Sequence, residues 1–275
     1  MLAQVLDFDQ GADLVPTLEA GGVALESGVG VLGGSCLAER LGHYVTLSAG
    51  ETQTLAALEQ QERSFKRGSV IRREQDDARD LFIVRKGWLY SSVLLGNGSR
   101  QIMRLHFPGD LLGVSSLAFG DSADSIIAVT DVSICPFDRE LLAALFQDHP
   151  RLAALVFTLA VAERVALADR LASIGRTSAR ARVASLICEV FARLRIMEGA
   201  HLSELILPIT QEDIGDATGL TAVHVNRMMR GLVEDGLIER SGSAIRLIDE
   251  HRLAQEANFI NRFAKIDTSW LPAAS

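Results

Sequence analysis

A short run of polar side chains near the carboxyl end of the chain has types and spacing that could read DNA bases. His224, Asn226 and Arg227 fall close together between residues 221 and 230. An arginine guanidinium can bond both acceptors on the major-groove edge of guanine at once. His224 and Asn226 lie beside it and can reach a phosphate or a base edge. Thr221 precedes the run, and threonine commonly caps the first turn of a helix. We therefore expect these side chains at the exposed start of a helix.

The surrounding sequence predicts the elements that would position this run. Thr210 can cap a helix over 211–217, with Asp213 in the capping-box position. Gly219 permits a sharp turn, and Thr221 caps a second, longer helix over 221–234. Two short strands joined around residues 241–243 follow as a wing. This order is a winged helix-turn-helix, whose second helix enters the major groove. The predicted DNA contacts are Thr210, Gln211, Thr221, Val223, His224, Asn226, Arg227, Arg230, Ser241 and Ser243.

A long predicted helix precedes this unit and indicates a homodimer. Pro150 suits a helix start, Gly175 suits its end, and apolar residues between them cover more than one stripe. One stripe can pack on the chain's own domain, and the second then needs a partner, most simply the same helix of another copy. The alternative is a helix buried within one subunit. The predicted dimer residues are Leu152, Leu155, Leu159, Ala162 and Leu171.

Upstream, short apolar runs alternate with turn signals from about residue 69 to residue 137, which is typical of a β-sandwich or small barrel. The clearest hairpin has Gly96, Asn97 and Gly98 between two apolar runs. The expected fold is therefore α+β, with a jelly-roll β-barrel, a long helix and a winged helix-turn-helix. The expected boundaries are a poorly ordered extension over 1–40, a sensor barrel over 41–148, a dimerisation helix over 149–175, a DNA-binding domain over 176–249, and a helix and tail over 250–275.

Composition excludes several other classes. The chain has 275 residues, of which 48% are hydrophobic and 23% charged, as in a folded domain protein. Of its net charge of -8, the first 175 residues carry -7 and Asp267 carries the remaining -1, while residues 176–265 have equal numbers of basic and acidic residues. No apolar stretch is long enough to span a bilayer, and the first ten residues lack a signal-peptide pattern, so a cytoplasmic location is expected. Cys36, Cys135 and Cys188 are too far apart for a metal motif, and no metal or cofactor is predicted.

Four segments together resemble the family of the cyclic-AMP receptor protein and the fumarate–nitrate reductase regulator. They are KRGSVI (66–71), LFIVRKGWLY (81–90), GSRQIMRLHFPGDLLG (98–113) and TQEDIGDATGLT followed by VNRMMRGL (210–232). The resemblance covers about four-fifths of the chain and leaves residues 1–40 outside. It implies a bacterial transcription regulator with a cyclic-nucleotide-binding-like sensor domain, which binds double-stranded DNA as a homodimer and contacts RNA polymerase.

The resemblance also places an effector pocket, although the residues depart from its pattern. The pocket residues would be Gly113, Val114, Ser115, Ser116, Asp124 and Ser125. Family members that bind a cyclic nucleotide have a glutamate after this glycine and an arginine about ten positions later. Val114 stands at the first place, and no Lys or Arg occurs between Arg104 and Arg139. We therefore expect no cyclic-AMP binding, because phosphate affinity depends largely on charge-assisted pairing.

The same residues also bear on other ligands and other functions. The iron–sulfur centre of the oxygen-sensing branch needs a cysteine cluster, which Cys36 alone cannot supply. Haem stays open, because His43, His106 and His149 are present. An alternative function is a ligand-sensing or haem-sensing module that acts through protein contacts and uses its last helices for packing. The polar start of the 221–234 helix favours DNA binding over that alternative. No phosphate loop, nucleophile motif or metal spacing indicates an enzyme.

Overall fold

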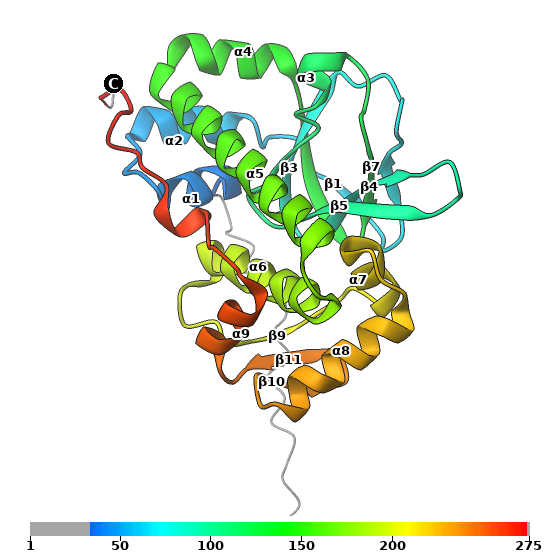
Figure 1. Cartoon of the computed structure of the whole chain (residues 1–275). Coiled ribbons are helices and arrows are strands. Elements are labelled where there is room, and N and C mark those ends of the chain that lie inside the picture. Colours follow the sequence, from blue (N-terminus) through cyan, green and yellow to red (C-terminus); the bar gives the residue numbers. More distant parts are fainter. Residues whose placement is uncertain (1–33, 274–275) are drawn as a thin grey trace, which may run out of the picture.

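The computed structural model describes residues 34–273. Its amino-terminal part contains two four-stranded antiparallel sheets, with strand orders β1-β8-β3-β6 and β2-β7-β4-β5. The strands are β1 (Arg63–Phe65), β2 (Val70–Arg72), β3 (Asp80–Lys86), β4 (Leu89–Leu94), β5 (Arg100–His106), β6 (Leu111–Leu112), β7 (Ser125–Ala128) and β8 (Val132–Asp138). Figure 1 shows these strands together above the carboxyl-terminal helices. This jelly-roll arrangement confirms the predicted fold class.

The two sheets form a sandwich and do not close into the barrel expected from the sequence. Three of the four edge strands are short: β1 and β2 have three residues each, and β6 has two. Such short edges offer few backbone groups for pairing across the gap between the sheets. The space between the sheets is filled by apolar side chains instead, including Val84, Leu89 and Ile134, all fully buried. The predicted hairpin joins β4 to β5, and Gly98 takes the left-handed φ of 83° that its turn needs.

The amino-terminal extension predicted over residues 1–40 is too long at its carboxyl end. Residues 1–33 lie outside the described range, but helix α1 (Cys36–Gly42) is built into the fold. Leu41 is fully buried, and the Glu59 carboxylate accepts hydrogen bonds from the backbone N–H groups of Cys36 and Leu37, at 3.1 and 3.0 Å. Cys36 is therefore buried. The glycine-rich context hid this helix because its stabilising partner is distant in the sequence.

Further helices cover the sandwich and lead to the carboxyl-terminal half. They are α2 (Ala49–Ala57), α3 (Ser116–Phe119), α4 (Arg139–Asp148) and α5 (Pro150–Arg176). Pro150 occupies the first turn of α5, where its missing N–H costs no hydrogen bond. In Figure 1, α5 runs from α4 along the sandwich towards the carboxyl-terminal helices. No helix in the described range is long and apolar enough to cross a membrane.

The carboxyl-terminal half folds around the predicted helix-turn-helix. Its elements are α6 (Ala179–Glu198), β9 (Glu204–Ile206), α7 (Gln211–Thr218), α8 (Ala222–Glu234), β10 (Ile238–Ser241), β11 (Ala244–Leu247), α9 (Glu250–Ala257) and a short 3-10 turn, η1 (Phe263–Lys265). The wing sheet has a third strand, β9, that sequence reasoning missed. The last helix ends at Ala257, because Asn258 takes a left-handed conformation with φ 49°.

The two halves are joined by buried polar contacts as well as by α5. Arg193 of α6 donates to the Leu105 carbonyl and pairs with Asp110 in the turn after β5. Arg40 of α1 pairs with the same carboxylate. Burial lowers the pKa of His106 well below its ordinary value, and the nearby arginines lower it further. Because a buried charge needs a partner, this cluster fixes α6 against the sandwich.

The chain beyond α9 returns to the sandwich side of the molecule. Figure 1 shows this segment, in red, leaving the winged helix and passing α5 and α1. Phe263 is buried, and Ile266 and Leu271 pack against the core formed by α1, α2, α4 and α5. The Thr268 hydroxyl donates to the Tyr44 carbonyl at 3.5 Å. The segment therefore ties the end of the winged helix to the sensor domain.

Candidate DNA-binding interface

Local capping and two glycines set the angle between α7 and α8. The Thr210 side chain accepts from the Asp213 N–H while Asp213 accepts from the Thr210 N–H, which completes the predicted capping box. Gly219 ends α7 in a left-handed conformation with φ 69°. Gly215 has a second role: a Cβ at this position would lie 2.4 Å from the Leu220 carbonyl oxygen. Only glycine lets the turn pack so closely on α7.

The start of α8 presents its side chains to solvent. Thr221 caps the helix through the His224 N–H, as predicted. Val223 is 79% exposed, and His224 and Arg227 are also exposed. The opposite face of α8 holds the helix on the domain through buried residues: Val225, Met229 and Leu232. The helix thus separates an apolar inner face from a free outer face at its amino-terminal end.

Asn226 and Gln211 connect the two helices of the motif. The Gln211 amide donates to the Asn226 Oδ1 at 3.3 Å. Asn226 is half-buried, whereas Arg227 and Arg230, which lie opposite the inner face of the helix, are exposed. Within residues 34–273, neither arginine forms an ion pair, in contrast to Arg180, which pairs with Asp235 and Glu256. Arg227 and Arg230 are therefore available to a negatively charged partner.

The wing and the start of α7 surround one groove. Thr210, Gln211 and Ser243 line it together with Arg240. Arg240 was not predicted, and its Nε donates to the Gly242 carbonyl at 3.1 Å, which stiffens the turn of the wing. Ser241 is exposed on the same hairpin. The structure thus brings three predicted residues and one missed arginine to the same place. The position of Arg240 directly before the SGS turn of the wing is the sequence feature that could have identified it.

The back of α7 is attached to the sensor domain. Arg100 of β5 pairs with Asp213 and Asp216, each at 2.7 Å, and its guanidinium lies 5.1 Å from the centre of the Tyr90 ring. Gln101 donates to the Asp216 carbonyl at 2.6 Å. These contacts hold α7 by the side opposite the groove. The β4–β5 hairpin therefore positions the helix-turn-helix directly.

The predicted effector-pocket residues lie near one another, next to an arginine that sequence reasoning missed. Arg72 of β2 is 8% exposed, and its Nη1 would lie 2.9 Å from a Cβ at Gly113. Its Nη2 donates to the Asp80 carbonyl at 2.6 Å, and its guanidinium lies 4.7 Å from the centre of the Phe82 ring. Burial lowers the pKa of Arg72. Arg72 precedes Ser125 by more than fifty residues and lies outside the segment in which the family pattern places its arginine.

The remaining pocket residues are held by local contacts. The Ser116 hydroxyl donates to the Gly113 carbonyl at 2.7 Å, and the Ser125 hydroxyl accepts from the Glu74 N–H at 3.0 Å. Burial raises the pKa of Asp124, which opposes a second negative charge beside it. Val114 is 39% exposed, and Ser115 is half-buried. This region is therefore occupied by the chain's own hydrogen bonds and one buried cation.

The histidines and cysteines are placed as structural residues. His106 Nε2 and the Ser91 hydroxyl lie 2.7 Å apart, and His149 Nε2 lies 2.9 Å from the Thr54 hydroxyl. Burial raises the pKa of the Cys36 and Cys135 thiols to about 11, and that of Cys188 to about 12. Thiols with such pKa values are poor nucleophiles and poor metal ligands at neutral pH. No group of metal-binding side chains occurs among residues 34–273.

Helix α5 divides the predicted dimer residues into two sets. Leu152, Leu155 and Leu159 pack in the chain's own core with α1, α2 and α4, so these three are revised to intrachain residues. Ala162 is half-buried, and Leu171 is 73% exposed. The large apolar side chains that α5 leaves exposed are Phe157, Val161, Leu167 and Leu171. The sequence showed that two stripes exist, but not which stripe faced inward.

Comparison with known proteins identifies both halves. Residues 62–149 match the cyclic nucleotide-binding domain family, and residues 181–256 match the Crp-like helix-turn-helix domain family. The nitrogen fixation regulation protein FixK of Bradyrhizobium diazoefficiens is 32% identical over 69% of this chain and 78% of its own. The fumarate and nitrate reduction regulatory protein of Escherichia coli strain K12 is 23% identical over 91% of this chain and 98% of its own. The solved structure of FixK2 from Bradyrhizobium japonicum aligns with a TM-score of 0.64 at 30% identity, covering 71% of this chain and 96% of that one.

Proposed function

Because the chain belongs to the CRP/FNR family of transcription regulators, we propose that it binds palindromic DNA as a homodimer, with one α8 helix from each copy in the major groove. Regulators of this family bind DNA through their helix-turn-helix and typically form homodimers. The observation that carries the proposal is the free amino-terminal face of α8. Val223, His224 and Arg227 are exposed there on a capped helix, with no internal partner for the arginine in the described range.

We assign different roles to the side chains of this face. Arg227 reads guanine, because its guanidinium is free to make two parallel hydrogen bonds. Val223 stands where the family pattern has a glutamate, and an apolar side chain can contact only a thymine methyl group. The half-site should therefore differ from the family consensus at the base pair that Val223 faces. His224 contacts phosphate or a base edge next to it, while Asn226 steadies the pair of helices through Gln211.

Phosphate contacts come from the margins of this surface. Thr210 and Gln211 lie at the start of α7, where free backbone N–H groups favour an anion. Arg230 lies one turn beyond Arg227 and reaches the backbone of the same groove. On the other side, the wing residues Ser241 and Ser243, together with Arg240, flank the adjacent backbone. Such contacts fix the position of the protein on the duplex without reading its sequence.

The dimer is proposed to form through the exposed stripe of α5. Phe157, Leu167 and Leu171 recur at spacings of ten and four residues along one side of this helix. Two copies packed along this stripe would remove these side chains from water and place two α8 helices about one helical turn of DNA apart. Contact with RNA polymerase, and action in the cytoplasm where the bacterial chromosome lies, follow from the family as parts of the same proposal.

The effector of the sensor domain is proposed to be something other than cyclic AMP. Val114 replaces the glutamate of the cyclic-nucleotide pattern, and Asp124 lies where a phosphate would come. Arg72 supplies a cation that the pattern had not indicated, but its contacts with Asp80 and Phe82 already engage it. The alternative function, a module acting through protein contacts alone, is disfavoured by the exposed polar face of α8.

Binding-site selection from random duplex DNA with the full-length protein tests this proposal. We expect enriched sequences to be palindromes with half-sites about one helical turn apart. Sedimentation at micromolar concentration should show a dimer. Enrichment of single, unpaired half-sites, or a monomer that binds as tightly as the assembled protein, would contradict the dimeric docking. No enrichment at all would contradict sequence-specific binding.

A further inference from the structure

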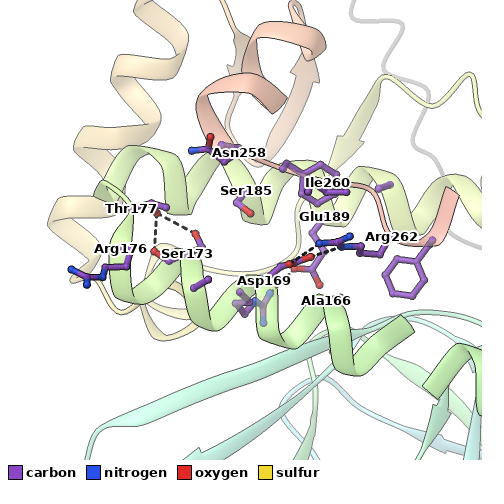
Figure 2. A pocket seen from close by; sticks show the side chains of 16 residues that line it. Ala166, Asp169, Ser173, Arg176, Thr177, Ser185, Glu189, Asn258, Ile260 and Arg262 are labelled. Atoms are coloured by element: carbon purple, nitrogen blue, oxygen red, sulfur yellow. Dashed lines mark hydrogen bonds and ion pairs between the residues drawn. The ribbon is translucent and has the colours of Figure 1, made fainter. Parts of the chain in front are cut away.

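An open cavity lies where α5, α6 and the segment after α9 meet. It measures about 310 Å³, which is of the size that holds a small organic ligand. Figure 2 shows Asp169, Ser173 and Arg176 on α5 lining one side, with Ser185 and Glu189 of α6 on another. Asn258 and Ile260 close it from the carboxyl-terminal segment. The cavity is separate from the effector-pocket region around Gly113 and from the DNA-binding face.

The walls of this cavity are largely apolar and small. Four alanines, at positions 166, 172, 192 and 257, line it together with Phe259 and Phe263. Small side chains at a junction of three elements leave space that larger residues would fill. Because Phe263 is buried and the segment beyond it packs on the sensor domain, the cavity is bounded by ordered structure.

Most charges at the cavity neutralise one another. Arg262 donates two hydrogen bonds to the Asp169 carboxylate, at 2.6 and 2.9 Å, as Figure 2 shows. Arg170 pairs with Glu189 at 2.9 Å. Arg176 is the exception, because no ion pair joins it to any carboxylate between residues 34 and 273. It lies at the end of the cavity, beside Thr177 (Figure 2).

The hydroxyl groups at the cavity are also partly engaged and partly free. Ser173 and Thr177 bond to each other at 3.2 Å, and Thr177 also donates to the Ser173 carbonyl. The Ser185 side chain has no such contact in the part of the chain that the structure describes. The cavity thus offers an apolar body, one free cation at its end and one free hydroxyl.

We propose that this cavity binds a small amphipathic monoanion, with its apolar body between α5 and α6 and its carboxylate on Arg176. The paired acids disfavour a cationic ligand, and the alanine and phenylalanine walls disfavour a highly polar one. The proposed dimer contact leaves the cavity open, because the α5 residues that line the cavity lie on a different side of the helix from the dimer stripe. Ala166, Asp169, Ser173 and Arg176 follow one another at spacings of three and four, on a different side from Leu167 and Leu171.

Binding at this place is expected to change DNA affinity, a consequence that rests on the proposed function. The ligand would contact both α5, which carries the dimer stripe, and α6, which carries the winged helix. It would also contact the segment that ties the winged helix to the sensor domain. Any difference in fit between two orientations of α6 would then shift the population of the orientation that binds DNA.

Calorimetric titration of the full-length protein with n-alkanoates tests the site without DNA. We expect affinity to rise from hexanoate through octanoate to decanoate, by about fourfold per added methylene while the chain still fits. Octanoate should bind on the order of tenfold more tightly than octanol or octylammonium, because only the acid pairs with Arg176. Equal affinity for the three head groups, or no dependence on chain length, overturns the proposal.

Two variants locate the bound acid. Ser185→Leu fills the cavity without removing a described hydrogen bond, and it should weaken octanoate binding by more than about tenfold. Arg176→Gln should abolish the preference of octanoate over octanol, with the exposed Arg73→Gln as a matched control that leaves it unchanged. Arg176 is exposed, so this variant folds whether or not Ser185→Leu does. Octanoate affinity and head-group preference that both substitutions leave unchanged overturn the assignment.

A DNA titration separates this inference from the proposed function. The wild-type protein should change its affinity for the selected operator when octanoate saturates the site, and Arg176→Gln should not at the same concentration. Octanoate binding with unchanged DNA affinity overturns the coupling while leaving the site in place. Failure to bind any operator either with or without octanoate contradicts the proposed function and leaves the calorimetric result unaffected.

Discussion

Polar side chains are exposed at the start of α8, whereas those in the effector-pocket region of the sandwich are engaged by hydrogen bonds within the domain. Around Gly113, the Ser116 hydroxyl and the Arg72 guanidinium are engaged by backbone carbonyls of the same domain. On α8, Arg227 and His224 are exposed, and Arg227 has no acidic partner within the described residues. Polar groups inside a protein must be satisfied internally, whereas a surface made for a ligand leaves them free. This difference indicates DNA as the dominant partner and leaves the sandwich with little unused binding capacity.

Loss of the dimer is the largest expected effect. It tests whether the exposed face of a single α8 is sufficient for specific DNA binding. The double substitution Phe157→Glu and Leu171→Glu places charges on the exposed stripe of α5. We expect a folded monomer with specific DNA affinity reduced on the order of a thousandfold, towards the non-specific level. Sedimentation and fluorescence anisotropy with the selected operator measure the two effects.

Leu159→Glu is the matched comparison for that experiment. Leu159 is 8% exposed and packs within the chain's own core. A buried carboxylate there should unfold the protein and should not yield a folded monomer. If Leu159→Glu gave a folded monomer while the double substitution left the dimer intact, the dimer contact would lie on the Leu159 face of α5 and not on the exposed stripe.

The next effect in size concerns base reading at the open face itself. Arg227→Ala should weaken binding to the selected operator by about 1–3 kcal/mol and relax the preference at one base pair of each half-site. Selection from random DNA with both proteins measures the change in specificity. Arg252→Ala on α9 is a control, because its guanidinium lies near Glu256 at 3.6 Å and outside the proposed interface. Identical selected sequences for Arg227→Ala and wild type would remove Arg227 as a base reader.

A smaller effect should distinguish phosphate contacts from base contacts on the same helix. Arg230→Gln should weaken binding to all duplex sequences almost equally and reduce the slope of log affinity against log salt by about 1. Anisotropy titrations at several salt concentrations, on the operator and on a scrambled duplex, measure this slope. A sequence-dependent loss with an unchanged salt slope would move Arg230 from the phosphate to the bases.

The sequence predicted the helix-turn-helix around α8 better than it predicted the effector-pocket region of the sandwich. Thr210, Gly219 and Thr221 act on neighbours within a few residues, so caps and turns can be recognised in a single segment. Arg72 acts on Gly113 and Asp80 across strands, and sequence spacing carries no signal for that contact. Helix α1, strand β9 and the buried pair of Arg193 and Asp110 were missed for the same reason. The inward stripe of α5 could not be chosen either, because both stripes are apolar.

The smallest expected effect is the absence of any response to cyclic AMP, and it tests the effector-pocket region of the sandwich directly. Millimolar cyclic AMP should leave both the melting temperature and the DNA affinity unchanged. A ligand that binds only the folded protein adds about 2.7 kcal/mol of stability at a hundredfold excess over its dissociation constant, so binding could not stay hidden in a melting curve. AMP is the control for non-specific nucleotide effects. A shift with cyclic AMP that AMP does not produce would show that Arg72 leaves the Asp80 carbonyl to pair with the cyclic phosphate. Arg72→Gln would then abolish the shift. If the shift survived that substitution, the cation would have to come from elsewhere. Arg104 is one candidate, because it lies opposite Ser91 in the pairing of β4 with β5, although it would have to leave its ion pair with Glu163.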